Sequence, residues 1–221
     1  MRPTFVIVFL AMLTSTHAAD EPMPVVKEPY HKSVFENEYV RIIDVQIPVG
    51  ETTKYHVHEI ASVVVYLTKS TNASQSWGET TTTPRQTTPG AVRYAPYDVT
   101  PLAHRVTNTG NNSFHVFDIE LLRKPDTAAF PPPPGQVSVQ WEQKLVRASN
   151  VFVRPGEAVI VNLPTCASLF VGIAGTTVTQ AKEGPQRELK PTAYVFYPRN
   201  SSVLLRNRGT EKAEAVLLEL R

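Results

Sequence analysis

The chain repeats itself, and this repetition constrains its fold more than any other feature. Three landmarks recur 106 positions later: Val40-Arg41, Gly50-Glu51 and Ser62 return as Val146-Arg147, Gly156-Glu157 and Ser168. Two more recur 99 positions later: Asn108-x-Gly110 returns as Asn207-x-Gly209, and Glu120-Leu121 returns as Glu219-Leu220. Matching landmarks at nearly constant offsets predict two copies of one fold.

The segments between the landmarks have the pattern of short β-strands. Residues 38–47 place Ile43, Val45 and Ile47 on one face and polar side chains on the other, which is the alternation of a half-buried strand. The chain has 19 prolines, and no long run shows the 3.6-residue period of a helix. We therefore predict an all-β protein made of two tandem domains.

A proline-rich stretch separates the two copies. Residues 131–134 are four consecutive prolines, and Gly135 follows them. Such a sequence cannot extend a central strand and favours a stiff, polyproline-like connector. We predict a first domain over residues 20–124, a connector over residues 125–140 and a second domain over residues 141–221.

Residues 1–19 have the order that is typical of a secretory signal peptide. A basic residue precedes an apolar run that ends at Leu13, and small residues follow it. The apolar run is shorter than the ~20 residues that a membrane span needs. We expect cleavage near Ala18 or Ala19, a secreted or periplasmic mature protein without a membrane anchor, and an extended arm over residues 21–35.

Charge and cysteine content exclude several classes of protein. The formal net charge is only +2 and the basic residues are scattered, so nothing indicates a nucleic-acid partner. Cys166 is the only cysteine. This excludes an internal disulfide and a thiolate metal cluster.

Two histidines one residue apart mark the candidate site. His56 and His58 precede the apolar run of residues 63–67. In a strand, both imidazoles point to the same face, and neutral imidazole is the commonest protein ligand for transition metals. A third ligand must come from elsewhere in the fold, and His104 is the best candidate.

The spacing Gly50-x5-His56-x-His58, followed by His104-x3-Asn108, resembles the two signature motifs of the cupin superfamily. The resemblance implies that each half of the chain is a small jelly-roll barrel, also called a double-stranded β-helix. It also implies that the first barrel holds one metal through His56, His58 and His104.

The motifs depart from the usual cupin pattern in two places. The superfamily's glutamate ligand is missing, because Ser62 and Val63 stand where it would be expected. The second motif has Val99 and Pro101 in place of its usual proline and glycine. We expect Ser62 to face the lumen and to hydrogen-bond a metal-bound water in place of the absent carboxylate.

The donor set defines the class of metal but not its identity. Three neutral imidazoles suit divalent iron, zinc, manganese, nickel or copper, and affinity order does not select among them. At the corresponding offsets, the second copy has Asn162, Pro164 and Val203. Proline and valine side chains cannot coordinate a metal, so we predict a degenerate second barrel with a structural role or a separate ligand.

The remaining candidates are interpreted as structural. His31 in the arm and His115 near a rim are expected to be satisfied or surface residues. Tyr97, which lies beside the second motif, is interpreted as a packing residue. Residues 63–67 are apolar on both faces, which predicts a covering second sheet or a partner subunit and allows a homodimer.

Two functional hypotheses follow. The first is a secreted metal-binding cupin with dioxygenase-like oxidoreductase activity on a small organic molecule, a reaction type implied only by the resemblance. The second is a non-catalytic cupin that binds a metal or a small ligand, or has a structural role. Fold alone does not decide between them.

Overall fold

The computed structural model describes residues 21–123, 130–133, 137–182 and 184–221. Over these residues the chain forms 19 strands in four sheets and one short 3-10 helix, η1 (Val25–Lys27). The prediction of an all-β fold is therefore confirmed. No helix in the described part of the chain is long and apolar enough to cross a membrane.

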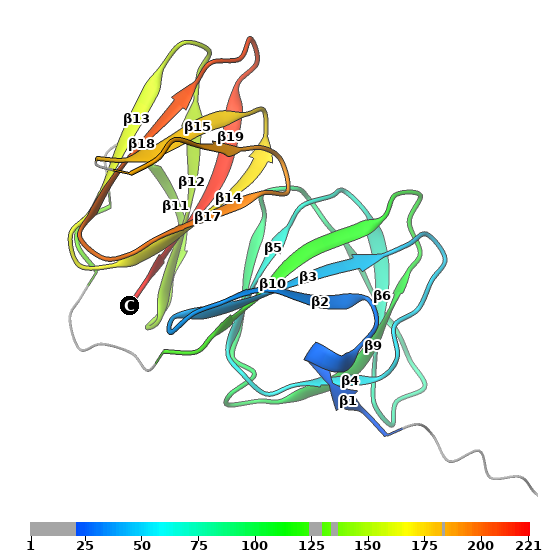
Figure 1. The fold of residues 1–221 in the computed structure, drawn as a ribbon. Helices are drawn as coiled ribbons and strands as arrows, with labels where there is room; N and C mark the ends of the chain where they lie inside the picture. Colours follow the sequence, from blue (N-terminus) through cyan, green and yellow to red (C-terminus); the bar gives the residue numbers. More distant parts are fainter. Residues whose placement is uncertain (1–20, 124–129, 134–136, 183) are drawn as a thin grey trace, which may run out of the picture.

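Two sheets of the N-terminal half face each other in the first barrel (Figure 1). In spatial order, one sheet contains β1 (Met23–Pro24), β4 (His56–His58), β9 (Leu102–Asn108), β6 (Thr71–Ser76) and β7 (Thr83–Gln86). The other contains β2 (His31–Glu36), β3 (Val40–Ile47), β10 (Phe114–Leu121), β5 (Ser62–Tyr66) and β8 (Val92–Ala95).

The C-terminal half builds a second barrel with the same strand order. One sheet contains β11 (Val137–Glu142), β12 (Val146–Val153), β19 (Ala213–Leu220), β14 (Ala167–Ala174) and β17 (Tyr194–Tyr197). The other contains β13 (Ala158–Leu163), β18 (Ser201–Asn207), β15 (Thr177–Ala181) and β16 (Arg187–Leu189). The order β3-β10-β5-β8 thus returns as β12-β19-β14-β17, so the duplication holds at the level of topology.

The repeated landmarks make the same hydrogen bonds in both barrels. The side-chain amide of Asn108 donates to the carbonyls of Ile47 and Asn112, at 2.8 and 2.9 Å. The equivalent amide of Asn207 donates to the carbonyls of Val153 and Glu211, at 2.9 and 2.7 Å. Each asparagine therefore ties the end of one strand to the loop that follows the asparagine itself, which is the physical reason that it recurs.

The two barrels share a hydrophobic core. Val63 and Val65 of β5 belong to the same buried cluster as Leu169 of β14 and Leu218 of β19. The apolar outer face predicted at residues 63–67 is therefore covered by the second barrel of the same chain. A homodimer remains a prediction and would have to use another surface.

The interior of the second barrel is filled by apolar side chains, which include Val161, Leu163, Phe170 and Val203. Val203 pairs with Val161 as His104 pairs with His56. The 106-residue offset therefore placed the second-copy equivalents one residue too late, at Asn162 and Pro164. Val161 lies five positions after Gly156, whereas His56 lies six positions after Gly50, and this difference of one residue shifts the register.

Two predicted boundaries require correction. Residues 21–35 were expected to form an extended arm, but they belong to the barrel: they form β1, η1 and most of β2, and β2 pairs with β3. The predicted connector ends earlier than residue 140, because β11 begins at Val137 and pairs with β12. The predicted signal peptide and much of the connector lie outside the described residues.

Candidate metal centre

The three predicted ligands meet inside the first barrel. His56 on β4 is the direct partner of His104 on β9, so both imidazoles lie on the same face of the sheet. His58 lies two residues further along β4 and shares that face. The Nε2 atoms of His58 and His104 are 3.2 Å apart, and the ring centroids of His56 and His104 are 4.7 Å apart.

A fourth imidazole joins them from the opposite sheet. His31 on β2 has its ring centroid 4.4 Å from that of His56, and one ligand nitrogen from each of His31, His56 and His58 lies within 4.8 Å of the others. His31 was expected to be a satisfied or surface residue of an extended arm. It is satisfied by its bond to Glu28, but it is only 7% exposed and lies on β2, which pairs with β3 in the barrel wall, so its ring reaches the predicted ligands.

Each of these four rings has a polar neighbour at its Nδ1 atom, and such outer neighbours orient a ring. For His31, His56 and His104 the contact is a hydrogen bond, and for His58 it is a close approach to a carboxylate without hydrogen-bond geometry. The partners are Glu28 Oε2 for His31 at 2.5 Å, the Lys54 carbonyl for His56 at 2.9 Å, Asp118 Oδ2 for His58 at 3.1 Å and Ser74 Oγ for His104 at 2.9 Å. A carbonyl only accepts, so Nδ1 of His56 carries the proton. Nε2 of His56 is then a free lone pair, buried and without a partner among the described residues.

Burial keeps the imidazoles of His56 and His104 neutral. Burial, with the neighbouring His31 and His58, lowers the pKa of His56 to about 3. Burial, with the neighbouring His56 and His58, lowers the pKa of His104 to about 2. Neutral imidazole is the form that coordinates a metal, so both rings are ready to act as ligands at neutral pH.

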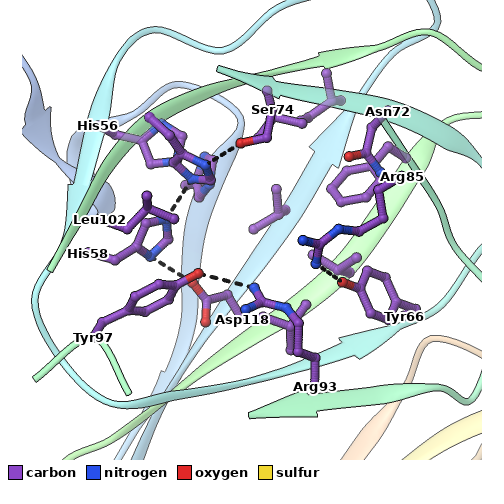
Figure 2. Close-up of a pocket in the computed structure, with 18 residues that line it drawn as sticks. His56, His58, Tyr66, Asn72, Ser74, Arg85, Arg93, Tyr97, Leu102 and Asp118 are labelled. Atoms are coloured by element: carbon purple, nitrogen blue, oxygen red, sulfur yellow. Dashed lines mark hydrogen bonds and ion pairs between the residues drawn. The ribbon is translucent and has the colours of Figure 1, made fainter. Parts of the chain in front are cut away.

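The rings line one wall of a cavity of about 150 Å³ (Figure 2). Apolar side chains form much of the remaining wall, among them Ile47, Leu102, Phe114 and Val116. A cavity of this volume accommodates a molecule about as large as benzene. The site is therefore suited to a small molecule rather than to a polymer.

No model of a protein family matches the sequence, and no curated protein matches it. Solved structures do match. A cupin 2 conserved barrel domain protein from Leptotrichia buccalis superposes with a TM-score of 0.54 at 10% identity, over 86% of this chain and 88% of that chain. Oxalate decarboxylase from Bacillus subtilis gives 0.59 at 11% identity, over 83% and 68%. A variant of salicylate 1,2-dioxygenase from Pseudoaminobacter salicylatoxidans gives 0.58 at 10% identity, over 82% and 70%.

This chain has the tandem cupin fold. The resemblance predicted from the histidine motifs is thus confirmed at the level of the fold. Identities of 10–11% show the fold alone, and the fold does not fix the chemistry of this chain.

A carboxylate that the sequence motifs did not indicate reaches the cavity from another strand. Asp118 on β10 is only 3% exposed, lines the cavity and contacts His58. Burial alone would raise the pKa of Asp118, but the contact with His58 and the nearby His31 outweigh it and lower that pKa. Asp118 is therefore ionised, and its Oδ1 atom has no hydrogen-bond partner in the described part of the chain.

The sequence pattern did not single out Asp118, because the apolar residues that marked its strand lie on the opposite face. Phe117 and Ile119 point to the core between the barrels, whereas Asp118 lies on the other face, between Val116 and Glu120. A buried acid in the middle of an apolar strand was the available signal. Ser62 does not take the place of the missing glutamate ligand, because its hydroxyl donates to the carbonyl of Ile60 at 3.0 Å.

Two other predictions can be compared with the structure. Nε2 of His115 lies 2.7 Å from Oδ1 of Asp44, and His115 does not line the cavity, so its interpretation as a satisfied residue is confirmed. Tyr97 does line the cavity, with its ring centroid 4.8 Å from that of His58. It therefore belongs to the site and is more than a packing residue.

These side chains fit a divalent transition metal. Two imidazole nitrogens bound to one metal at about 2.0–2.1 Å stand roughly 3 Å apart, close to the separation of the Nε2 atoms of His58 and His104. The outer nitrogens of His31 and His56 are hydrogen-bonded to a carboxylate and to a carbonyl, as in known metal sites. Imidazole donors suit zinc, copper, iron and nickel, and the arrangement does not select among them.

Proposed function

We propose that the first barrel binds one divalent transition metal through His56, His58 and His104, with His31 as a further ligand. We also propose that the protein is a dioxygenase-like oxidoreductase acting on a small organic molecule. The observation that carries the proposal is the convergence of four imidazoles, each with a polar neighbour at Nδ1, on one small cavity.

A bound metal would supply Lewis acidity and, if it is iron, the capacity to activate dioxygen. The protein residues provide the setting. Glu28 and Asp118 orient His31 and His58, while Ile47, Phe114 and neighbouring apolar residues form a wall that limits water. Oxalate decarboxylase and salicylate 1,2-dioxygenase share the fold, and the former contains Mn(II) centres. These likenesses support the proposed class of chemistry.

A non-catalytic metal-binding cupin is the second candidate. It is favoured by the number of imidazoles at the centre, because four nitrogen ligands leave fewer open positions for a substrate than three. In that case the protein would store or sense a metal, or use it to stabilise the fold.

The two candidates differ in turnover. The protein should be purified, its metal measured by mass spectrometry, and oxygen uptake followed with phenolic, thiol and diketone compounds after loading with iron, manganese, nickel, copper or zinc. Metal-dependent uptake that is lost in His56→Ala would support the oxidoreductase. Stoichiometric metal without turnover would favour the non-catalytic protein, and absence of metal in every preparation would exclude both.

We further propose that the protein is exported, as the order of residues 1–19 indicates. Expression of the whole chain in a secreting host, followed by mass spectrometry of the N-terminus, tests this. A mature chain that starts after Ala18 or Ala19 would support export, and retention of Met1 in the cytoplasm would contradict it.

A further inference from the structure

Two arginines enter the cavity on the side opposite the histidines (Figure 2). Arg85 lies on β7 and Arg93 lies on β8, the last strands of the two sheets of the first barrel. Only the residues between 86 and 92 separate these strands in the chain. The barrel therefore presents two guanidinium groups to the same cavity that the four imidazoles line.

Arg93 has no anionic partner in the described part of the chain. Its Nη2 atom donates to the phenol oxygen of Tyr97 at 3.1 Å, and its Nε atom is buried and unpaired. Burial raises the pKa of Tyr97, so this phenol is neutral and does not offset the charge of Arg93. A partly buried cation with a free N–H donor is costly unless an anion completes its shell.

Among the residues that the structure describes, Arg85 too is paired only with a neutral group. Its Nη1 atom lies 3.4 Å from the phenol oxygen of Tyr66, and its side chain is exposed at the cavity. The nearest acid of the cavity, Asp118, is engaged with His58. A bound divalent cation would make this already cationic cavity more positive, which favours an anionic ligand.

We infer that the cavity binds a small organic carboxylate. Its carboxylate group is held by Arg93 and Arg85, and its carbon skeleton lies against the apolar wall at Ile47 and Phe114. The planar fork of a guanidinium matches a carboxylate better than it matches a neutral amide, and the volume of about 150 Å³ limits the ligand to roughly the size of benzoate. This inference names the substrate class of the proposed function. It rests on the proposed function, which supplies the chemistry at the other end of the bound molecule.

Calorimetric titration of the full mature chain tests the inference. Acetate, butyrate and benzoate are each compared with the corresponding amide, which has a similar shape but no charge. We expect at least one carboxylate to bind about 10-fold to 100-fold more tightly than its amide. Arg93→Gln should remove most of this preference, and Arg85→Gln should remove less because Arg85 is more exposed.

The matched control is Arg105→Gln. Arg105 follows His104 on β9 but does not line the cavity, since its Nε atom donates to Gln75 at 2.8 Å and its guanidinium lies over Tyr55. The preference should survive in this variant. Arg93→Lys serves as a second variant, because it keeps the charge and loses the fork, and it should retain part of the preference.

Two results would overturn the inference: equal binding of every carboxylate and its amide, or a preference that persists in the Arg93→Gln/Arg85→Gln double variant. Metal content is measured on the same samples by mass spectrometry. Stoichiometric metal without carboxylate preference would contradict the inference alone. Carboxylate preference that depends on Arg93 in a protein that never binds metal would contradict the proposed function alone.

Discussion

The Nε2 atoms of His58 and His104 lie 3.2 Å apart, although 46 positions separate the two residues in the chain. The register of β4 and β9 brings them together, because His56 pairs directly with His104 and His58 shares the same face. Since this spacing is close to that of two nitrogens on one metal, ligation requires little movement of the backbone.

Replacement of His56 and His104 by valine should remove the metal and leave the fold intact. The second barrel has Val161 and Val203 as the equivalent cross-strand pair, so the scaffold accepts valine there. We expect the free energy of unfolding to change by less than about 2 kcal/mol, as measured by urea denaturation, and bound metal to be undetectable by mass spectrometry. His115→Ala should keep full metal occupancy. Metal retained in the double variant would refute the ligand assignment.

Loss of Glu28 should weaken metal binding without touching a ligand. Glu28 Oε2 holds Nδ1 of His31 at 2.5 Å, and loss of such an outer partner typically reduces metal affinity by about 10-fold to 100-fold. We expect Glu28→Gln to show a decrease of this size and His31→Ala a larger one, both measured by competition with a chelating dye. The neighbouring Lys32→Ala is the control, since Lys32 is exposed. If the metal affinity of His31→Ala were unchanged, His31 would not be a ligand and the site would consist of His56, His58 and His104.

A buried ion pair in the second barrel should be sensitive to the loss of one partner. Arg147 Nη2 lies 2.5 Å from Oε1 of Glu219, and both residues are buried. Glu219→Ala leaves the buried guanidinium with only the half-exposed Glu142, at 3.5 Å, as an acidic partner and should cost about 3 kcal/mol in urea denaturation. The double variant Arg147→Leu/Glu219→Leu should recover most of this loss, because no charge remains buried.

The exposed pair Arg154–Glu157, at 3.8 Å, provides the comparison for that measurement. Glu157→Ala should cost less than about 1 kcal/mol, since solvent screens exposed charges. Equal losses for Glu157→Ala and Glu219→Ala would show that burial is not what makes the Arg147 pair sensitive.

The repeated asparagines should contribute equally to the two barrels. Asn108 and Asn207 each donate to two carbonyls and accept from the backbone amide two residues later. Substitution of either by alanine leaves buried groups unpaired and should cost about 2–4 kcal/mol by urea denaturation. Asn111→Ala, at an exposed turn position, should cost less than about 0.5 kcal/mol. A large difference between Asn108→Ala and Asn207→Ala would contradict the equivalence of the landmarks.

Local pattern was sufficient to predict some parts of the fold and site. Alternation predicted strands, and recurrence of Asn108 as Asn207 predicted a duplicated architecture. The i, i+2 spacing of His56 and His58 predicted a shared face because a strand has a period of two. These inferences need only neighbouring residues or an internal comparison.

A fixed offset in residue number does not identify equivalent residues where the loops of the two copies differ in length. The offset of 106 residues led to Asn162, whereas the structural equivalent of His56 is Val161. A slip of one residue moves a side chain to the opposite face of a sheet. The apolar filling of the second barrel was therefore visible only in the register of β13 and β18.

The sequence by itself determined that this protein is all-β, duplicated and supplied with a histidine pair on one strand. Only the tertiary structure decided that His31, Asp118, Arg85 and Arg93 share a cavity with that pair. They lie on β2, β10, β7 and β8, strands that are distant from His56 in the chain. The physical reason is that barrel closure, rather than local spacing, brings their inward-facing side chains together.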